Sequence, residues 1–410
     1  MVNDQTPDYA YNFELLGHSD VGGYGDTVQI MKNRDHLYVG HHFTSRMSIL
    51  DVTDPRKPDF VDFIEAPPNT SSLHCQTADD LLLAVNAVNT LGAIADETEY
   101  YTKPLGETFQ TGDLDYAAGL RIWDISKPKE PQEIGFMPVE GLGLHRIWYT
   151  GGQYAYASAQ IRGFADYIFI VVDVSDPTKP HEVGRWWLPG MWTEGGETPN
   201  WPEGQRYSLH HAVIAGDTAY GSWRDGGLTL LDISDRTQPE LISHVNWCPP
   251  FGGGTHNAVP LLDRDLLIVL DEAVLDDCQD QVKYIWVVDI REPSNPVTVA
   301  TFPTPAEEDY CNKGAHFGPH NVHENRPGSF QSSELIFATY QNAGVRAFDI
   351  SNHFRPEEVG AFVPPAPATM TDPRPNRPQV IQSCDVYVDP DMVCYVSDNN
   401  AGLHVLQYTG

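Results

Sequence analysis

One motif recurs along the whole chain and limits the folds that the chain can adopt. In each copy, a run of apolar residues ends in Asp. The Asp is followed by Ile or Val, then by a polar turn, and a Pro stands seven residues after the Asp. The Asp residues of the six copies are at positions 51, 124, 173, 232, 289 and 349. The side chains of Asp, Ser and Thr form hydrogen bonds with the backbone of a turn. Pro has no backbone N–H to donate, which is tolerated at the edge of a sheet. Each copy therefore predicts a β-hairpin.

A second pair of strands is expected between successive hairpins. The pattern of apolar strand, tight turn and apolar strand occurs at 144–160, 208–223 and 255–272. A hairpin cannot bury its faces alone, so four-stranded units must stack, as propeller blades do. Residues 384–408 supply three strands and residues 11–20 can supply the fourth. We therefore predict an all-β fold, a single domain over 1–410 that is a seven-bladed β-propeller, its ring closed by the N-terminal strand joining the last blade.

The hairpin repeat resembles the LVIVD-repeat family of β-propeller proteins, and the resemblance covers nearly the whole chain. The six hairpins carry it, above all the stretches ILDVTDPRKP, VVDVSDPTKP and AFDISNHFRP. The resemblance implies the propeller fold and is largely silent on activity. Regular Gly-His and Trp-Asp signatures are missing, so a WD40 scaffold is the poorer match.

Composition narrows the classes of function. The chain has 25 Lys and Arg against 57 Asp and Glu, and its net charge is −32. Because contacts to phosphate need clustered basic residues, we expect no nucleic acid and no anionic membrane surface as partners. No signal peptide and no membrane span are visible, so a cytoplasmic protein is expected. The six cysteines lack zinc-type spacing, which predicts reduced thiols, with a bridge such as Cys278–Cys311 as the alternative for an excreted form.

Histidine occupies one repeat position in five consecutive units. The first residue of the innermost strand is, in turn, His74, His145, His210, His256 and His320, and the other two units have Asp26 and Cys384 there. These side chains should converge beside the central channel. Converging imidazoles would repel each other if charged, so a bound metal explains them better than a packing or turn-bonding role, which is the alternative. We expect a divalent transition metal held by some of the five, with Fe(II) favoured over Mn, Zn or Cu. His323 should lie on the opposite strand face and is not expected to be a ligand.

Three other polar residues are candidates for catalysis, because they end a second strand on the same face. His42, Glu272 and Arg224 are expected to move protons or bind substrate, and a merely polar strand end is the alternative. The planar guanidinium of Arg224 suits a substrate carboxylate, unless it pairs with Asp225.

Long loops are expected to form a lid on this face. They span 89–119, 189–207, 273–283, 304–319 and 364–380. Their aromatic residues either line an apolar pocket or hold the lid down: Tyr100, Tyr101, Phe109, Tyr116, Trp192, Trp201 and Tyr207.

These features favour a metal-dependent enzyme that acts on a small, partly apolar organic molecule. An all-imidazole site leaves coordination positions open and accepts Fe(II), so oxygenase chemistry is the first expectation. A Mn- or Zn-dependent lyase or hydrolase, with Glu272 or His42 moving protons, is the alternative. A non-catalytic binding scaffold is the alternative to both kinds of enzyme. Motifs such as GxSxG, HExxH and phosphate-binding loops are absent from the sequence.

Overall fold

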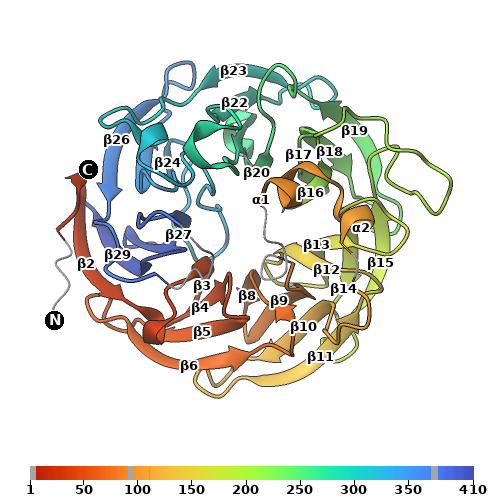
Figure 1. Ribbon diagram of the computed structural model, residues 1–410, viewed down its shortest axis with the longest axis horizontal. Helices are drawn as coiled ribbons and strands as arrows, with labels where there is room; N and C mark the ends of the chain where they lie inside the picture. Colours follow the sequence, from red (N-terminus) through yellow and green to blue (C-terminus); the bar gives the residue numbers. More distant parts are fainter. Residues whose placement is uncertain (1–5, 91–96, 110, 371–376) are drawn as a thin grey trace. The chain divides into compact units, whose positions relative to one another are not determined.

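The computed structural model describes residues 6–90, 97–109, 111–370 and 377–410. The chain divides into two compact units. The first unit comprises Met1–Thr44, Ser48–Asp62 and Val259–Gly410, and the second comprises Ser45–Met47 and Phe63–Ala258. Antiparallel strands dominate both, and the two α-helices among the described residues, α1 (Glu97–Thr102) and α2 (Leu105–Thr108), are short (Figure 1). The all-β class is therefore confirmed. None of the helices in the described part of the chain is long and apolar enough to cross a membrane.

The strands of the second unit form antiparallel groups that follow each other in chain order. The groups are β8-β9-β10-β11, with β7 also on β9, then β12-β13-β14-β15 and β16-β17-β18-β19, and a pairing of β9 with β12 joins the first two groups in one sheet. The strands are β7 (Thr70–Ser71), β8 (Cys75–Ala78), β9 (Leu81–Val88), β10 (Gly119–Asp124), β11 (Gln132–Pro138), β12 (Gly143–Trp148), β13 (Tyr154–Gln160), β14 (Ile168–Asp173), β15 (His181–Trp186), β16 (Tyr207–Ala215), β17 (Thr218–Arg224), β18 (Leu228–Asp232) and β19 (Glu240–Val245).

The first unit is built in the same way, and its borders fall within β5, β6 and β20. Its antiparallel groups of strands are β3-β4-β5-β6, β20-β21-β22-β23, β24-β25-β26-β1 and β27-β28-β29-β2. The strands are β1 (Tyr9–Tyr11), β2 (Phe13–Ser19), β3 (Thr27–Asn33), β4 (His36–His41), β5 (Arg46–Asp51), β6 (Asp59–Glu65), β20 (Thr255–Leu261), β21 (Leu266–Asp271), β22 (Ile285–Asp289), β23 (Val297–Thr301), β24 (Leu335–Thr339), β25 (Val345–Asp349), β26 (Glu357–Val363), β27 (Ser383–Val388), β28 (Val393–Asp398) and β29 (Gly402–Tyr408).

All six predicted hairpins form. Their strand pairs are β5/β6, β10/β11, β14/β15, β18/β19, β22/β23 and β25/β26. In each, the Oδ1 atom of the motif Asp accepts a hydrogen bond of 2.7–3.1 Å from the backbone N–H two residues later. The carboxylate therefore fixes the turn, as the motif predicts.

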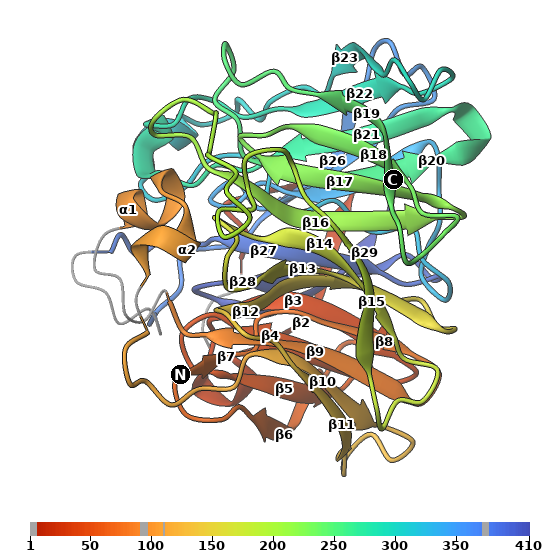
Figure 2. The ribbon, with the colours of Figure 1, turned by 90° about the vertical axis from the view of Figure 1, so that its right-hand side faces the viewer.

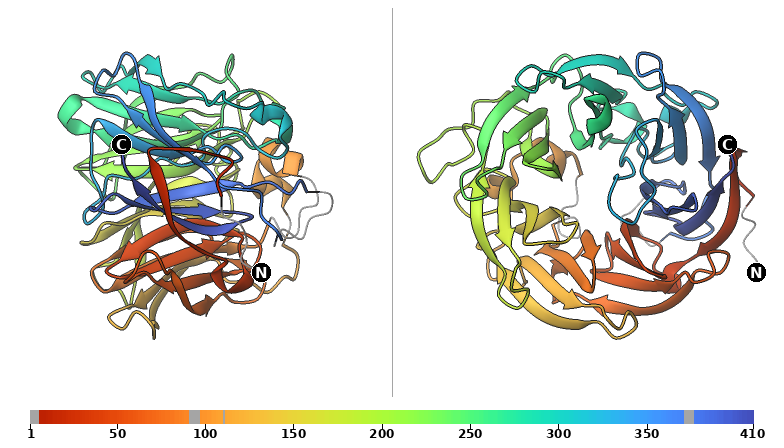
Figure 3. Two further views of the ribbon diagram at one scale, coloured as in Figure 1. Left: turned by 90° about the vertical axis from the view of Figure 1, so that its left-hand side faces the viewer. Right: turned by 180° about the vertical axis from the view of Figure 1, so that it is seen from behind.

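The N-terminal strand completes the sheet made by the C-terminal strands. β2 pairs antiparallel with β29, from Phe13 opposite Tyr408 to Ser19 opposite Leu403. Figure 3 shows β2 along the edge of this sheet, beside the C-terminus. The predicted pairing of the N-terminal strand with the last strands is therefore confirmed.

A buried imidazole in this sheet should make the protein sensitive to acid. His404 of β29 is 1% exposed, and its ring centroid lies 4.8 Å from that of His18. Burial, and then the neighbouring His18, hold the pKa of His404 well below its usual value of 6.5. Below pH 6.5 the unfolded chain binds a proton at His404 that the folded chain does not bind. Stability that is present above this pH is therefore lost as the pH falls.

We expect His404→Leu to remove this part of the acid sensitivity. The unfolding free energy of the wild type should fall more steeply below pH 6.5, by up to about 1.4 kcal/mol per pH unit for this one group. Urea unfolding of both proteins at pH 7 and at about pH 5 measures the difference. The exposed His181 gives a matched control, because His181→Leu should leave the slope unchanged. Equal slopes for wild type and His404→Leu would contradict the assignment.

One predicted strand is wrong. The innermost strand expected to begin at His320 is reduced to an isolated bridge between Val322 and Ala338. Pro319 and Pro327 lie on either side of this stretch. Proline has no N–H to donate to a neighbouring strand, and it restricts the backbone conformation of the residue before it.

The expectation of reduced thiols is wrong for one pair of cysteines. Cys278 and Cys311 form a disulfide, which joins loops 273–283 and 304–319, whereas Cys75, Cys248, Cys384 and Cys394 are reduced. The Cys278–Cys311 bridge, which the sequence analysis gave as the alternative, is therefore the one that forms. It closes a loop over a sequence separation of 33 residues, and such a loop restricts the unfolded chain substantially.

Removing this disulfide should destabilise the protein. We expect Cys278→Ser with Cys311→Ser to lower the unfolding free energy by about 2–4 kcal/mol, because the unfolded chain regains loop entropy. The urea midpoint under non-reducing conditions is the measurement. Cys248→Ser, which removes a reduced thiol, is the control. A midpoint shared by the double variant and the oxidised wild type would show that the bridge is absent from the protein in solution.

Candidate metal site

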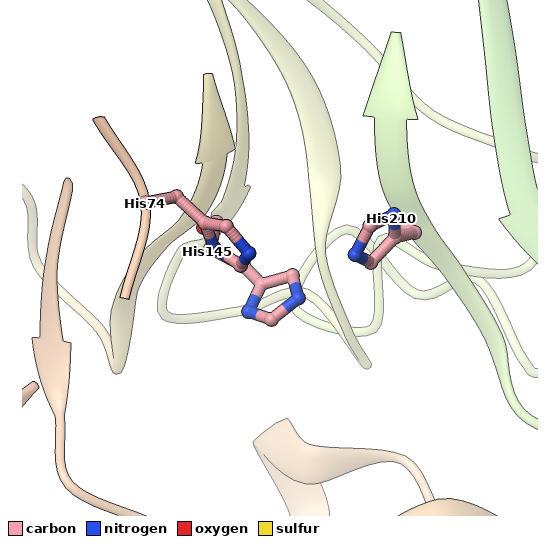
Figure 4. A group of neighbouring side chains, drawn as sticks. All are labelled: His74, His145 and His210. Atoms are coloured by element: carbon pink, nitrogen blue, oxygen red, sulfur yellow. The ribbon is translucent and has the colours of Figure 1, made fainter. Parts of the chain in front are cut away.

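Three of the five predicted histidines meet in the second unit. His74 precedes β8, His145 lies in β12 and His210 lies in β16. Ring centroids are 4.8 Å apart for His74 and His145 and 4.9 Å apart for His145 and His210. One nitrogen of each ring lies within 4.8 Å of the others. Figure 4 shows the three rings around a common space. Their role as metal ligands stays a prediction.

A repeated hydrogen bond orients two of these rings. His74 Nδ1 lies 2.5 Å from the backbone oxygen of His145, and His210 Nδ1 lies 2.7 Å from that of His256. Because a carbonyl oxygen only accepts, each Nδ1 carries the proton and each Nε2 keeps a lone pair. Imidazoles that bind a metal are commonly held in this way through their other nitrogen.

Irregular strand pairing presents His145 and His210. The pairing of β12 with β13 shifts between Leu144 and Ile147, and that of β16 with β17 shifts between Tyr207 and His211. Each histidine lies within such a shift. Bulges bend a strand and redirect its side chains, and they are common beside active sites.

The buried imidazoles of this cluster are neutral. His74 and His210 are 3% and 4% exposed. Burial, and then the charge of Arg146, lower the pKa of His74 well below its usual value, while burial and then His256 lower that of His210. Neutral imidazole is the form that binds a metal, since the ligand must be deprotonated. The ring of His256 stacks on that of His210 at a centroid distance of 3.4 Å.

Arg146 is a residue that the sequence reasoning missed. It is 1% exposed, and its positive charge contributes to the low pKa of both His74 and His210. This positive charge makes the binding of a cation without further ligands less favourable. It favours a cation that also binds an anion, such as hydroxide or a carboxylate. An Arg directly after a repeat-position His was the available signal, because basic residues are scarce in this chain.

A small cavity lies beside His145. Its volume is ≈ 20 Å³, which is room for about one water molecule. The walls combine aliphatic side chains with polar groups from three rings and a few small residues: Ser71, Leu73, Val85, Ala87, Val88, Asn89, Thr90, Tyr100, Leu144, His145 and Tyr167. The Tyr167 ring centroid is 5.5 Å from that of His145.

A buried ion pair fixes the helices near this cavity. Figure 2 shows α1 and α2 together at one end of the strands of the second unit. Arg206 donates to both oxygens of Asp166 at 2.7 and 2.9 Å, and to the backbone oxygen of Tyr100 at 3.3 Å. The N–H of Leu105 donates to Asp166 as well. The described parts of loops 89–119 and 189–207 are thereby tied together, through an ion pair that sequence reasoning missed. Residues 91–96, 110 and 371–376, which fall in the predicted lid loops, lie outside the described residues.

The predicted lid aromatics divide by role. Tyr100 lines the cavity. Tyr101, Phe109 and Tyr116 pack around the cluster of Val88, Tyr100, Leu105, Leu142 and Tyr167. Trp201 stacks on Tyr207 with centroids 4.8 Å apart, and Trp192 is 42% exposed. Of these seven aromatic residues, Tyr100 alone lines this cavity.

The three catalytic candidates lie in different surroundings. Arg224 ends β17 with a φ of 48° and is 6% exposed, and its guanidinium carbon lies 5.1 Å from the centre of the Tyr101 ring. The ring of His42, in the first unit, stacks on that of Phe43. Glu272, also in the first unit, has its Oε1 atom 3.4 Å from His320 Nε2. These contacts leave their catalytic roles as predictions.

Asp26, which is at the repeat position, and His323 have their hydrogen-bond partners within the first unit. Asp26 is fully buried and bonds to His41, whose other nitrogen contacts Ser48 at 2.6 Å. A substrate cannot reach the side chains of Asp26, His41 and Ser48, because all three are inaccessible to solvent. Both nitrogens of His323 contact backbone groups, of Phe330 and Val388, which agrees with its exclusion as a ligand.

The chain contains LVIVD repeats. The family model described as LVIVD repeat matches residues 150–187, 212–246 and 279–304, which include three of the six hairpins. The predicted resemblance is therefore confirmed. Among curated proteins, no significant match to this sequence is found.

The backbone is similar to those of known β-propellers. The β-propeller domain of Cps50 (Swd1) from Myceliophteria thermophila has a TM-score of 0.55 at 11% identity, over 94% of this chain and 98% of that one. A putative 6-phosphogluconolactonase from Bacteroides fragilis has a TM-score of 0.54 at 10% identity, over 82% and 84%. The periplasmic gluconolactonase PpgL of Pseudomonas aeruginosa has a TM-score of 0.52 at 10% identity, over 82% and 86%. At such identities the similarity shows the propeller fold alone.

Proposed function

Because the chain carries LVIVD repeats and shares the fold of solved β-propellers, we propose that it forms one seven-bladed propeller domain over 1–410. Six hairpin units and the sheet that β2 completes support seven blades. The pairing of β2 with β29 would close the ring, since it joins the two ends of the chain in one sheet. An experimental structure with six or eight blades would contradict this proposal.

We further propose that the protein is a metal-dependent enzyme whose metal is held by His74, His145 and His210. One observation carries the proposal: three imidazoles converge, with Nδ1 of His74 and of His210 bound to a backbone oxygen. The cost of gathering these imidazoles in one place is explained if they bind an ion together. His256 and His320 stay candidates for the same role.

A hydrolase or lyase is the reaction class that the site supports best. Three imidazoles with an open position for water are a ligand set of catalytic zinc, and the cavity beside His145 has room for about one water molecule. A metal there would supply an activated water or polarise a substrate oxygen. Arg146 would favour an anionic substrate group. Two of the similar structures are named lactonases, but the proposal rests on the site and not on them.

Oxygenase chemistry with Fe(II) is the second candidate. The three-histidine cluster contains no carboxylate among the described residues, whereas the common non-haem iron oxygenases use two histidines and a carboxylate. The volume of the cavity, ≈ 20 Å³, nevertheless suits a molecule as small as O2. Mn and Cu remain further candidates for the same imidazoles.

Metal analysis of protein made without an affinity tag tests the proposal. We expect a transition metal to co-purify or to bind with well-defined stoichiometry, and a chelator to abolish activity. Hydrolysis of esters and lactones, compared with iron-dependent oxygen uptake, separates the two reaction classes. A protein that binds no metal and shows neither activity would instead support a non-catalytic scaffold.

The expected partners and location are also proposals. A small-molecule substrate is the proposed partner, with neither nucleic acid nor a membrane surface, because of the net charge of −32. A cytoplasmic location is proposed from the sequence, and the Cys278–Cys311 disulfide is the observation against it, because disulfides persist mainly in oxidising compartments.

A further inference from the structure

Four residues that carry a hydroxyl group line the cavity beside His145. Each is 8% exposed or less, and they come from four segments of the second unit: Ser71 of β7, Thr90 after β9, Tyr100 of α1 and Tyr167 before β14. None of the four hydroxyls has a hydrogen-bond partner among the residues that the structure describes. Buried polar groups in proteins almost always have a partner. Four such groups around one cavity therefore indicate that a polar molecule or group occupies it.

The hydroxyl groups can all donate a hydrogen bond to the occupant. A phenol is protonated at neutral pH, and burial, followed by the neighbouring Tyr100, raises the pKa of Tyr167 well above its usual value of 10. The hydroxyls of Ser71 and Thr90 can donate as well. The cavity therefore suits an occupant that accepts several hydrogen bonds.

The charges around the cavity favour an anion as this occupant. The described residues that line it include no Asp and no Glu, although the chain has 57 of them. The guanidinium carbon of Arg206 lies 5.0 Å from the centre of the Tyr100 ring and 6.0 Å from that of Tyr167. Arg206 is paired with Asp166, but its charge lowers the pKa of Tyr167 more than the charge of Asp166 raises it. The ion pair as a whole thus favours negative charge beside the phenols.

We propose that this cavity binds a carboxylate oxygen of a small ligand through its four hydroxyl groups. A carboxylate oxygen is about as large as a water molecule, and the cavity volume of ≈ 20 Å³ has room for about one water. The proposal deepens the function proposed above, because a substrate held here by its carboxylate would lie beside His145. It rests on that function for the reaction, whereas the binding itself needs no metal. The alternative occupant is a water molecule that bridges the hydroxyls.

Formate is the probe, because it offers a carboxylate without further bulk. Titration of ¹³C-labelled formate into the full-length protein, with a chelator present, should give saturable broadening of the ¹³C signal. Tyr167→Phe should raise the formate dissociation constant at least about tenfold, because a hydrogen bond to a charged group is lost. Tyr100→Phe should have the same effect, and it tests the site even where Tyr167→Phe does not fold. Circular dichroism establishes that each variant is folded.

Two controls make the result specific. Tyr154→Phe removes a phenol hydroxyl from β13, opposite Asp173 and outside the cavity, and should leave the dissociation constant unchanged. Formamide has nearly the size of formate but no charge, and it should bind at least about tenfold more weakly, because hydrogen bonds to an ionised group are stronger.

The titrations distinguish failure of this subsite from failure of the proposed metal site. They are made without metal, so their outcome does not depend on whether the three-histidine cluster binds one. Three results would overturn the proposal and leave a bridging water as the occupant. They are a wild type that does not bind formate, an unaltered affinity in Tyr167→Phe and Tyr100→Phe, and equal binding of formate and formamide.

Discussion

Replacing His145 and His210 together with Ala is expected to reduce the metal bound by the protein by one equivalent per chain. These residues supply two of the three converging imidazoles of the second unit. Losing a group that merely orients a ligand already costs about 10- to 100-fold in metal affinity. Losing two ligands should therefore lower the affinity of that site by more than about 100-fold. Elemental analysis after equilibrium dialysis against Zn²⁺ or Fe²⁺ measures the change.

The exposed His181 provides the matched control in the same unit. His181→Ala removes an imidazole from the edge strand β15 and should leave the metal content unaltered. The catalytic readout should follow the metal content, since the same residues would hold the reacting centre. An unchanged metal stoichiometry in the double variant would exclude the three-histidine cluster as a metal site.

The hairpins could be predicted because their chemistry is local. The carboxylate of Asp173 bonds the N–H and the hydroxyl of Ser175, two residues away, so the same few letters specify the same turn wherever they occur. The pairing of Phe13 with Tyr408 spans almost the whole chain. It could still be predicted, because a sheet with three strands near the C-terminus needs a fourth.

The details of the candidate site could not be predicted in the same way. The repeat register brings His145 and His210 to equivalent strand positions, but the pairing shifts that contain them leave no mark in the sequence. The isolated bridge at Val322 also replaced an expected strand, but here Pro319 and Pro327 were a signal in the sequence against a regular strand. The position of a bulge depends on the twist of neighbouring strands, which a single segment does not encode.

Interactions between distant loops were also beyond the sequence. Asp166 and Arg206 are 40 residues apart in segments without a repeat pattern, and each could equally be an ordinary surface charge. The Cys278–Cys311 bridge was expected only as an alternative to reduced thiols, because six cysteines allow several pairs and the sequence does not choose between them. Such contacts depend on how the loops fold back over the strands, and the repeat determines the strands but not the loops.

Removing one partner of the Asp166–Arg206 ion pair should strongly destabilise the protein. Arg206 is 2% exposed, and Asp166 is fully buried and also accepts from the hydroxyl of Ser208. Asp166→Leu leaves the guanidinium buried without its carboxylate. Breaking a buried pair in this way typically costs about 3–5 kcal/mol, because the remaining charge is desolvated and uncompensated. Urea unfolding measures the change in unfolding free energy.

The double variant Asp166→Leu with Arg206→Met should be more stable than Asp166→Leu alone. A buried ion pair that is replaced as a whole by apolar side chains leaves no stranded charge, and such replacements are often nearly neutral. The exposed pair of Arg185 and Glu182 is the control, and Glu182→Leu should cost less than about 1 kcal/mol. Because the pair also holds Leu105 and Tyr100, proteolysis at residues 97–109 should accelerate in Asp166→Leu. A loss below about 1 kcal/mol, or a double variant no more stable than the single one, would mean that water reaches Arg206 and that α1 and α2 are held by apolar packing instead.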